Sequence, residues 1–184
     1  MRLHNQYGQR KYLNQAERLR FFERTKTYSI DTKLFCQLLF YTGARISEIH
    51  KLKPDSIDFS NGTVIIETLK KRHRGVFREI PLPPHLLDDL EDYIEWLKVK
   101  KSLWPFSLRT ASRRLKAIME DLEIIGVRGC ARGLRHGFAV HAVNKVPLTL
   151  VKKWLGHATL ETTEIYLQVL GMEERALAKK VWTT

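Results

Sequence analysis

The stretch of residues 56–69 most constrains the fold, because its side-chain periodicity differs from that of the sequence on either side. It has β-branched residues before and after Asn61-Gly62, a dipeptide typical of a tight turn between antiparallel strands. A basic loop, residues 70–75, separates this hairpin from a further apolar stretch that ends at Leu82. We therefore predict a three-stranded antiparallel sheet over residues 56–82.

Helical spacing dominates the rest of the chain. Asn14 and Glu17 form a capping-box signature at the start of one predicted helix, and Gly43 ends the next. The apolar spacing predicts further helices over 44–52, 85–101, 110–126, 134–144 and 148–157, and a last helix that carries Tyr166. In this prediction Arg135 lies at the start of its helix. The fold class is α+β: a mostly helical domain with a small three-stranded antiparallel sheet.

Composition limits the function classes. The 184 residues include 43% hydrophobic ones, which is enough for one domain with a core. The net charge of +12 indicates a polyanionic partner, most often nucleic acid, or else a basic solvated surface. The sequence has no apolar run of ~18 residues that would span a membrane, and it begins without a signal peptide. Cys36 and Cys130 are unclustered, which fits a reducing compartment, so we expect a cytoplasmic protein.

Cationic or phenolic side chains lie close to predicted helix ends or loops in separate parts of the chain. Each has an ordinary explanation when it is taken alone: an arginine paired with Glu48, a solvated hairpin tip, a helix cap, or an aromatic ring packed in the core. The residues concerned are Arg45, the basic loop 70–75, Arg132 with Arg135 and His136, His157, and Tyr166.

Taken in order, these segments resemble a known family. "TGARISEI", a lysine in a β-hairpin, "GLRHGFA" and "LGHATLETTEIY" are similar to the ordered signature of the tyrosine recombinases, or phage integrase family. The resemblance covers roughly residues 14–170. It implies a basic N-terminal arm at 1–12, a catalytic domain at 13–170, and a C-terminal tail at 171–184. The tail either docks on a neighbouring protomer or packs on its own domain.

The resemblance also implies a role for each matching residue. Arg45 and Arg135 would bind the non-bridging oxygens of a DNA phosphate, which suits the planar guanidinium group. Lys70, or Lys71 if the loop aligns differently, would protonate the leaving 5′ oxygen. His157 would form a hydrogen bond with the phosphate, and Tyr166 would attack the phosphorus to give a 3′-phosphotyrosyl bond. We expect no metal ion and no cofactor.

Two features depart from the family pattern. Arg132, a sixth candidate catalytic residue, stands where the family usually has a histidine. An arginine can orient the phosphate but cannot accept a proton at neutral pH, so water or His136 would assist the deprotonation of Tyr166. The family also usually has an N-terminal helical domain, so the chain is either a naturally short recombinase or part of a longer one. Other basic residues are expected to contact the DNA backbone; these are Lys71, Arg72, Arg74, Arg113 and Arg114, with Lys152 and Lys153.

The sequence thus predicts a site-specific DNA recombinase. It would act on double-stranded DNA as a homotetramer that joins two sites, and it would be monomeric when free. One alternative is a catalytically attenuated DNA-binding regulator, which the arginine at position 132 would mark. Another is a topoisomerase-like enzyme that relaxes DNA without recombining it.

Overall fold

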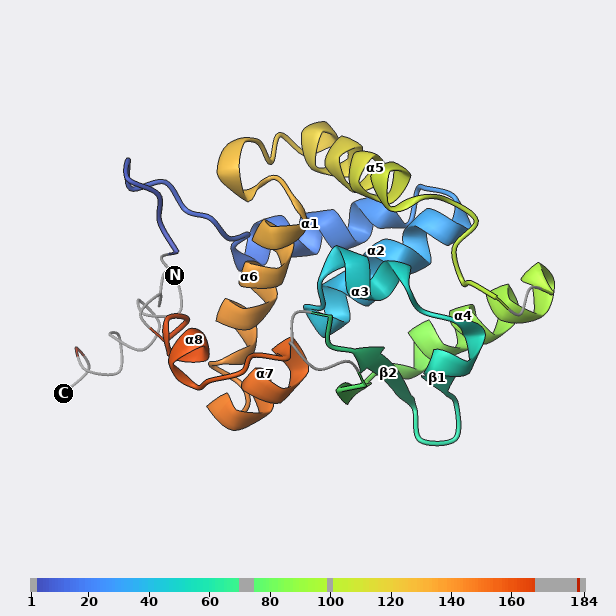
Figure 1. The fold of residues 1–184 in the computed structure, drawn as a ribbon. Helices are drawn as coiled ribbons and strands as arrows, with labels where there is room; N and C mark the ends of the chain where they lie inside the picture. The colour runs from blue at the N-terminus through green and yellow to red at the C-terminus, as the bar shows by residue number, and fades with distance from the viewer. Residues whose placement is uncertain (1–2, 70–74, 99–100, 168–181, 183–184) are drawn as a thin grey trace.

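The computed structural model describes residues 3–69, 75–98, 101–167 and 182 of the protein (Figure 1). Helices and a small sheet surround a common core. The helices are α1 (Gln15–Thr25), α2 (Ile30–Thr42), α3 (Ile46–His50), α4 (Pro84–Leu97), α5 (Leu108–Asp121), α6 (Ala131–Ala142), α7 (Leu148–Leu155) and α8 (Glu161–Glu164), with short 3-10 turns η1 (Pro54–Ser56) and η2 (Gly126–Arg128).

The predicted three-stranded sheet is confirmed. Strands β1 (Ile57–Asp58), β2 (Thr63–Glu67) and β3 (Phe77–Pro81) pair antiparallel in the order β1-β2-β3. Val64 pairs with Ile57 on one side and with Ile80 on the other, and all three are buried. Gly62 supplies the left-handed turn, with φ of +64°, at the predicted hairpin. The sheet therefore packs one face on the core and leaves the other to solvent.

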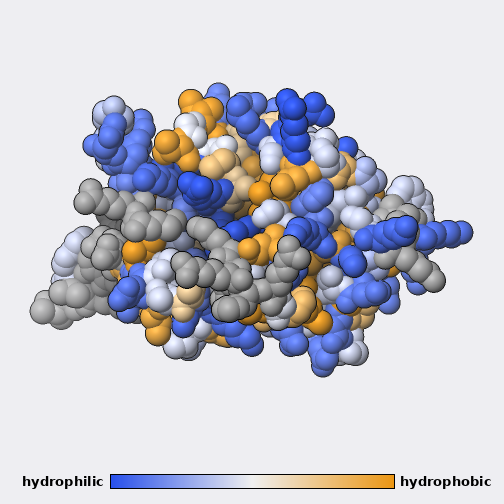
Figure 2. Space-filling model, viewed as in Figure 1, coloured by the Kyte–Doolittle hydropathy of each residue, from blue (hydrophilic) through white to orange (hydrophobic). Residues whose placement is uncertain are grey.

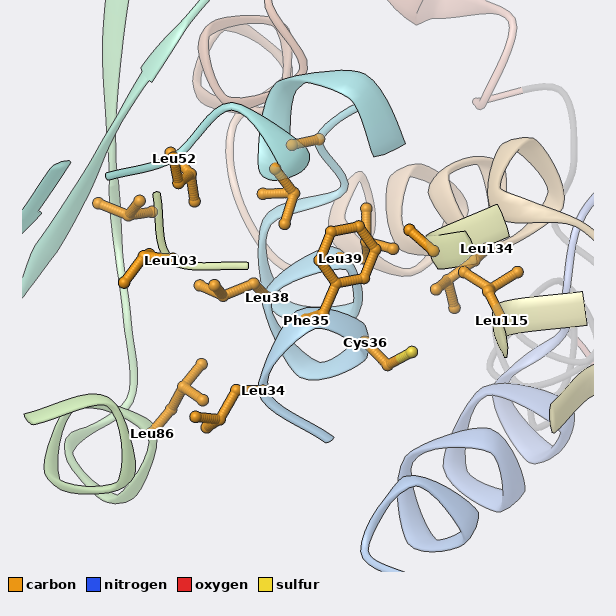
Figure 3. Packing of buried hydrophobic residues seen from close by; sticks show 14 of the residues in the cluster. Leu34, Phe35, Cys36, Leu38, Leu39, Leu52, Leu86, Leu103, Leu115 and Leu134 are labelled. Carbon is orange, nitrogen blue, oxygen red and sulfur yellow. The ribbon is translucent and has the colours of Figure 1, made fainter. Parts of the chain in front are cut away.

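Helix α2 is the centre of the core (Figure 3). Its buried side chains point in several directions, because α1, α4, α5 and α6 all pack around it. Leu34 faces Leu86 of α4, while Cys36 points toward Leu115 of α5. A helix that is apolar on nearly every side holds its neighbours at fixed positions.

Helix α2 ends at a glycine that no other residue could replace without strain. Gly43 has a φ of +60°, and a Cβ atom there would lie 2.2 Å from the Phe138 ring of α6. Both the backbone conformation and the close approach require glycine. The predicted helix stop is thus confirmed, and it brings Arg45, two residues later, beside α6.

A second core cluster joins the N-terminal segment to the C-terminal part of the domain. Leu3 and Tyr12 are buried with Phe138, Leu155 and Tyr166. A short hairpin holds the segment, because the amide of residue 11 donates to the carbonyl of residue 3 at 2.8 Å. The segment at 1–12, predicted as a polar arm, therefore contributes two apolar side chains to the core.

Helix α5 is shorter than predicted. The expected end was Gly126, but the helix ends at Asp121 because Glu123 adopts a left-handed conformation with φ of +57°. The amide of Ile124 then donates to the carbonyl of Met119 at 2.8 Å, and the Ile124 side chain is buried. This is a Schellman end in which glutamate takes the place usual for glycine.

Two further expectations about helix positions were wrong. Arg135 does not begin a helix: α6 starts at Ala131, after Cys130 in an extended conformation, so Arg135 is one turn inside. Tyr166 is not in a helix either. Helix α8 ends at Glu164, because the amides of Tyr166 and Leu167 bond to carbonyls three residues back. The tyrosine therefore follows the helix in a tight turn.

The surface on the face of Figure 1 is mostly hydrophilic, with hydrophobic side chains in separate groups (Figure 2). Within the described ranges, no helix is long and apolar enough to cross a membrane. The predicted loop residues Lys70, Lys71, Arg72 and Arg74 lie outside the described residues, as does the tail at 171–184 except for Trp182.

Candidate active site

Arg45 is held at the start of α3 by its own first turn. Its amide donates to one carboxylate oxygen of Glu48 at 2.9 Å, and its Nη1 donates to the other at 2.7 Å. The Arg45 side chain keeps 26% of its surface exposed, whereas the Glu48 side chain is fully buried. The pairing with Glu48 thus fixes the guanidinium group at the edge of a cavity.

Glu48 belongs to a buried network that also includes Arg78 of β3. Nη2 of Arg78 lies 2.6 Å from Glu48, and its Nε donates to the Trp154 carbonyl at 2.7 Å. Burial alone would raise the pKa of Glu48, but the charge of Arg78 and hydrogen bonds from both arginines hold it below its usual value. The carboxylate stays ionised between two guanidinium groups.

Arg135 joins the ends of two helices. Its Nη1 donates to the Gly43 carbonyl at the end of α2, and its Nη2 donates to the Leu155 carbonyl at the end of α7, each at 2.8 Å. The side chain is buried, and burial together with the charge of Arg45 lowers the pKa of Arg135 to about 10. It remains protonated at neutral pH.

His157 follows the left-handed Gly156 that ends α7. Burial, and then the positive charges of Arg135 and Arg45, lower the pKa of His157 to about 3. The ring is therefore neutral at physiological pH and carries one proton. Its Nδ1 lies 3.0 Å from the hydroxyl oxygen of Thr163.

Tyr166 is fully buried, and its hydroxyl oxygen lies 2.9 Å from Nδ1 of His136. Burial raises the pKa of Tyr166 to about 12, although Arg135 and Arg45 act in the opposite direction. Burial and the nearby charges of Arg135 and Arg132 lower the pKa of His136 to about 4. Both groups are neutral at pH 7, so the contact is a hydrogen bond between a neutral phenol and a neutral imidazole, and the tautomer of His136 determines which one donates.

These side chains converge on one cavity of about 740 Å³. It brings together five of the six residues predicted to be catalytic, and Leu69, next to Lys70 in sequence, also contributes to its wall. The residues that line it are Arg45, Ile46, Ser47, Leu69, Ala131, Arg132, Arg135, His136, His157, Thr162 and Tyr166. Three arginines make the cavity a site for an anion with several oxygens. The described residues contain no group of three or more His, Cys, Asp or Glu side chains that could hold a metal ion.

Some residues of the site were predicted only in part or not at all. His136, or a water molecule, was predicted to assist the deprotonation of Tyr166; its Nδ1 lies 2.9 Å from the Tyr166 hydroxyl oxygen, and its role stays a prediction. Thr163 was not singled out. Arg78 carries a signal that alternation could have revealed, because it lies two residues before the buried Ile80 and on the same face of β3. Glu48, three residues after Arg45, was considered only as a surface partner, whereas it is buried.

The predicted DNA contacts on α5 differ in their surroundings. Arg113 is exposed. Arg114 is half-buried: its Nη1 donates to Asp31 at 2.7 Å and to the Thr32 hydroxyl at 2.8 Å, and its guanidinium lies over the Phe106 ring. The contacts seen for Arg114 hold α5 against α2, and its role in binding DNA stays a prediction.

Comparisons with known proteins agree with this geometry. Residues 10–172 match the model of the phage integrase family. Tyrosine recombinase XerA of Pyrococcus furiosus is 31% identical over 170 residues, which covers 86% of this chain and 57% of the relative. The tyrosine recombinase of Thermosipho africanus is 32% identical over 160 residues, covering 81% of this chain and 53% of the relative. The chain thus spans little more than half the length of these relatives.

Solved structures show the same fold. A crystal structure of XerA recombinase superposes with a TM-score of 0.77 at 22% identity, covering 92% of this chain and 64% of that one. The catalytic domain of bacteriophage HP1 integrase gives 0.68 at 22% identity, covering 90% of this chain and 92% of that one. A post-cleavage complex of XerH site-specific recombinase bound to its palindromic difH substrate gives 0.78 at 21% identity, with 94% and 53% covered. The chain therefore belongs to the phage integrase family and carries the catalytic domain of a tyrosine recombinase.

Proposed function

We propose that the chain performs the strand cleavage and rejoining of a site-specific DNA recombinase, through a 3′-phosphotyrosyl intermediate. The observation that carries the proposal is the convergence of Arg45, Arg135, His157 and Tyr166 on one cavity. These residues come from different parts of the chain, and together they supply charge, hydrogen-bond donors and a nucleophile.

In the proposed reaction a DNA phosphate lies between Arg45 and Arg135. The Tyr166 oxygen forms a bond to phosphorus as the bond from phosphorus to the 5′ oxygen breaks. The leaving 5′ oxygen takes a proton from a general acid, for which we propose Lys70 or Lys71. Attack by a second 5′ hydroxyl on the phosphotyrosine reverses the step and releases Tyr166. One phosphoester bond replaces another, so the exchange needs no external energy source.

The main energetic problem is the phenol proton. With a Tyr166 pKa of about 12, forming the phenolate at pH 7.5 costs roughly 6 kcal/mol. The cavity arginines compensate by stabilising the additional negative charge of the pentavalent phosphorus. Arg132 contributes charge in place of the family's usual histidine, but it cannot accept the proton. His136 contacts the phenol, and we propose that the phenol proton passes to His136 or to water as the Tyr166 oxygen bonds to phosphorus.

The partners follow from the same reaction. We propose that the protein binds double-stranded DNA and acts as a homotetramer on two sites, with the tail at 171–184 docking on a neighbour. XerH in the structure cited above is bound to its difH substrate, and the charge of +12 is compatible with a polyanionic partner. We place the activity in the cytoplasm of a bacterium or archaeon, or of a cell that carries a phage.

Trapping the covalent intermediate tests the proposal. The substrate is a pool of DNA duplexes with randomised central sequences, each carrying a nick close to its centre. Cleavage next to the nick releases a short fragment, so the strand cannot be rejoined and the covalent adduct is trapped. We expect a labelled protein–DNA adduct that survives denaturation with the natural chain and is absent with Tyr166→Phe. DNA binding by the natural chain without any adduct would instead identify a regulator. Adducts with plasmid relaxation but no strand exchange between two selected sites would identify a topoisomerase-like enzyme.

A further inference from the structure

The hydroxyl of Thr163 is a buried polar group next to the His157 ring. Thr163 is fully buried, and its oxygen lies 3.0 Å from Nδ1 of His157. Its amide already donates to the Leu160 carbonyl at 2.7 Å, and its carbonyl accepts from the Tyr166 amide at 3.1 Å. The side chain is thereby held in place by the same turn that carries the tyrosine.

The surroundings determine which atom donates. Among the described residues, Nδ1 of His157 is the one hydrogen-bond partner of the Thr163 hydroxyl. If Nδ1 carried the ring proton, the hydroxyl proton of Thr163 would be buried without an acceptor, which costs about as much as a lost hydrogen bond. The favourable arrangement therefore has the threonine O–H donating to an unprotonated Nδ1.

A neutral imidazole has one N–H, so an unprotonated Nδ1 leaves the proton on Nε2. The ring is neutral because burial and the charges of Arg135, Arg45 and Arg78 disfavour the imidazolium form. His157 also lines the cavity. The ring nitrogen away from Thr163 is thus a hydrogen-bond donor and cannot act as a base.

We propose that Thr163 is a positioning residue that fixes His157 in the Nε2–H tautomer and so makes it a donor to a phosphate oxygen in the cavity. The phosphate part rests on the proposed function; the tautomer does not. Thr163 precedes Tyr166 by three residues, so the turn that places the nucleophile also orients the histidine. In the stretch "ETTEIY" the proposal therefore gives the second threonine, Thr163, a specific role.

The tautomer is measured directly on the free protein labelled with ¹⁵N-histidine. Two-bond ¹H–¹⁵N correlation spectra at pH 7.5 distinguish Nε2–H from Nδ1–H rings, and a His157→Asn variant identifies the His157 signals. We expect Nε2–H in the natural chain and in Thr163→Ser, which keeps the hydroxyl. A His157 ring protonated on Nδ1 in the natural chain would overturn the proposal, whatever the variants do.

Thr163→Val removes the hydroxyl at nearly constant shape. We expect a mixture of His157 tautomers and adduct formation slowed by about 10- to 100-fold, with DNA affinity within about twofold of the natural chain and rescue in Thr163→Ser. Thr159→Val, which changes an exposed threonine of the same segment, serves as the control. An unchanged tautomer and rate in Thr163→Val would refute the proposal. If no variant forms an adduct, the proposed function fails while the spectra still decide the role of Thr163.

Discussion

Replacing Arg78 with methionine tests how much the buried charge network contributes to stability. The Arg78 side chain is 4% exposed and donates to Glu48 at 2.6 Å, to the Thr68 hydroxyl at 2.9 Å and to the Trp154 carbonyl at 2.7 Å. Methionine fills a similar volume but satisfies none of these acceptors. The buried Glu48 carboxylate then keeps Arg45 as its one cationic partner in the network.

Removing one member of a buried ion pair costs about 3–5 kcal/mol, a large part of the roughly 5–15 kcal/mol that stabilises a typical domain. With a urea dependence of roughly 2 kcal/mol per molar, the unfolding midpoint should fall by about 2 M. The measurement is equilibrium urea unfolding followed by circular dichroism at pH 7.5, with the slope compared between variants.

Arg24→Met is the matched control. Arg24 pairs with Asp121 at 2.9 Å, but the two side chains are 43% and 40% exposed. Water screens this pair, so its loss should lower the free energy of unfolding clearly less than the loss of the Arg78 pair. Equal losses of unfolding free energy in the two variants would refute the reasoning, because Arg78 is buried and satisfies three acceptors, whereas the Arg24 pair is exposed to water.

Two further predictions concern the glycine at the end of α2 and the effect of pH. Gly43→Ala forces a side chain into a left-handed backbone conformation and against the Phe138 ring. We therefore expect the free energy of unfolding, measured in urea, to fall by more than about 2 kcal/mol. Gly8→Ala is the control: Gly8 has a similar φ and no atom within 4 Å of the added Cβ, so the free energy of unfolding should fall clearly less. The folded pKa values of His136 and His157, about 4 and about 3, lie below the ordinary 6.5. The contribution of these two histidines to the free energy of unfolding is therefore complete above about pH 6.5. It is lost as the pH falls toward their folded-state pKa values, by no more than about 1.4 kcal/mol per pH unit for each histidine. An unfolding free energy that stays constant between pH 6.5 and 5 would contradict this prediction.

Local sequence patterns predicted most of the elements correctly, because their signals act over a few residues. The hairpin at Asn61-Gly62 and the helix stop at Gly43 each depend on backbone conformations that few residues adopt. The end of α5 was not predicted, because glutamate seldom adopts the left-handed conformation that ends this helix. Glu123 takes a left-handed conformation that burial of Ile124 stabilises, and no local pattern marks it.

The site was predicted by the order of its motifs, whereas its supporting contacts depend on the tertiary structure. Arg114 and Asp31 are 83 positions apart and still form a 2.7 Å ion pair. The sequence around either residue therefore does not indicate that the arginine is paired with a carboxylate. The Glu48 carboxylate can likewise be buried because it pairs with Arg78, which is 30 positions away in the sequence. Local sequence patterns cannot show which charged side chains form ion pairs inside the fold.

Arg135 shows why structure and chemistry are hard to separate in this domain. The last carbonyls of a helix lack partners within the helix, and they form the negative end of its dipole. Arg135 donates to such carbonyls at the ends of both α2 and α7, which offsets part of the cost of burying its charge. Its guanidinium also lines the cavity. The helix ends therefore hold a cation where a phosphate would need it, and a lysine, with a single charged nitrogen, could not span both carbonyls and present the same planar face.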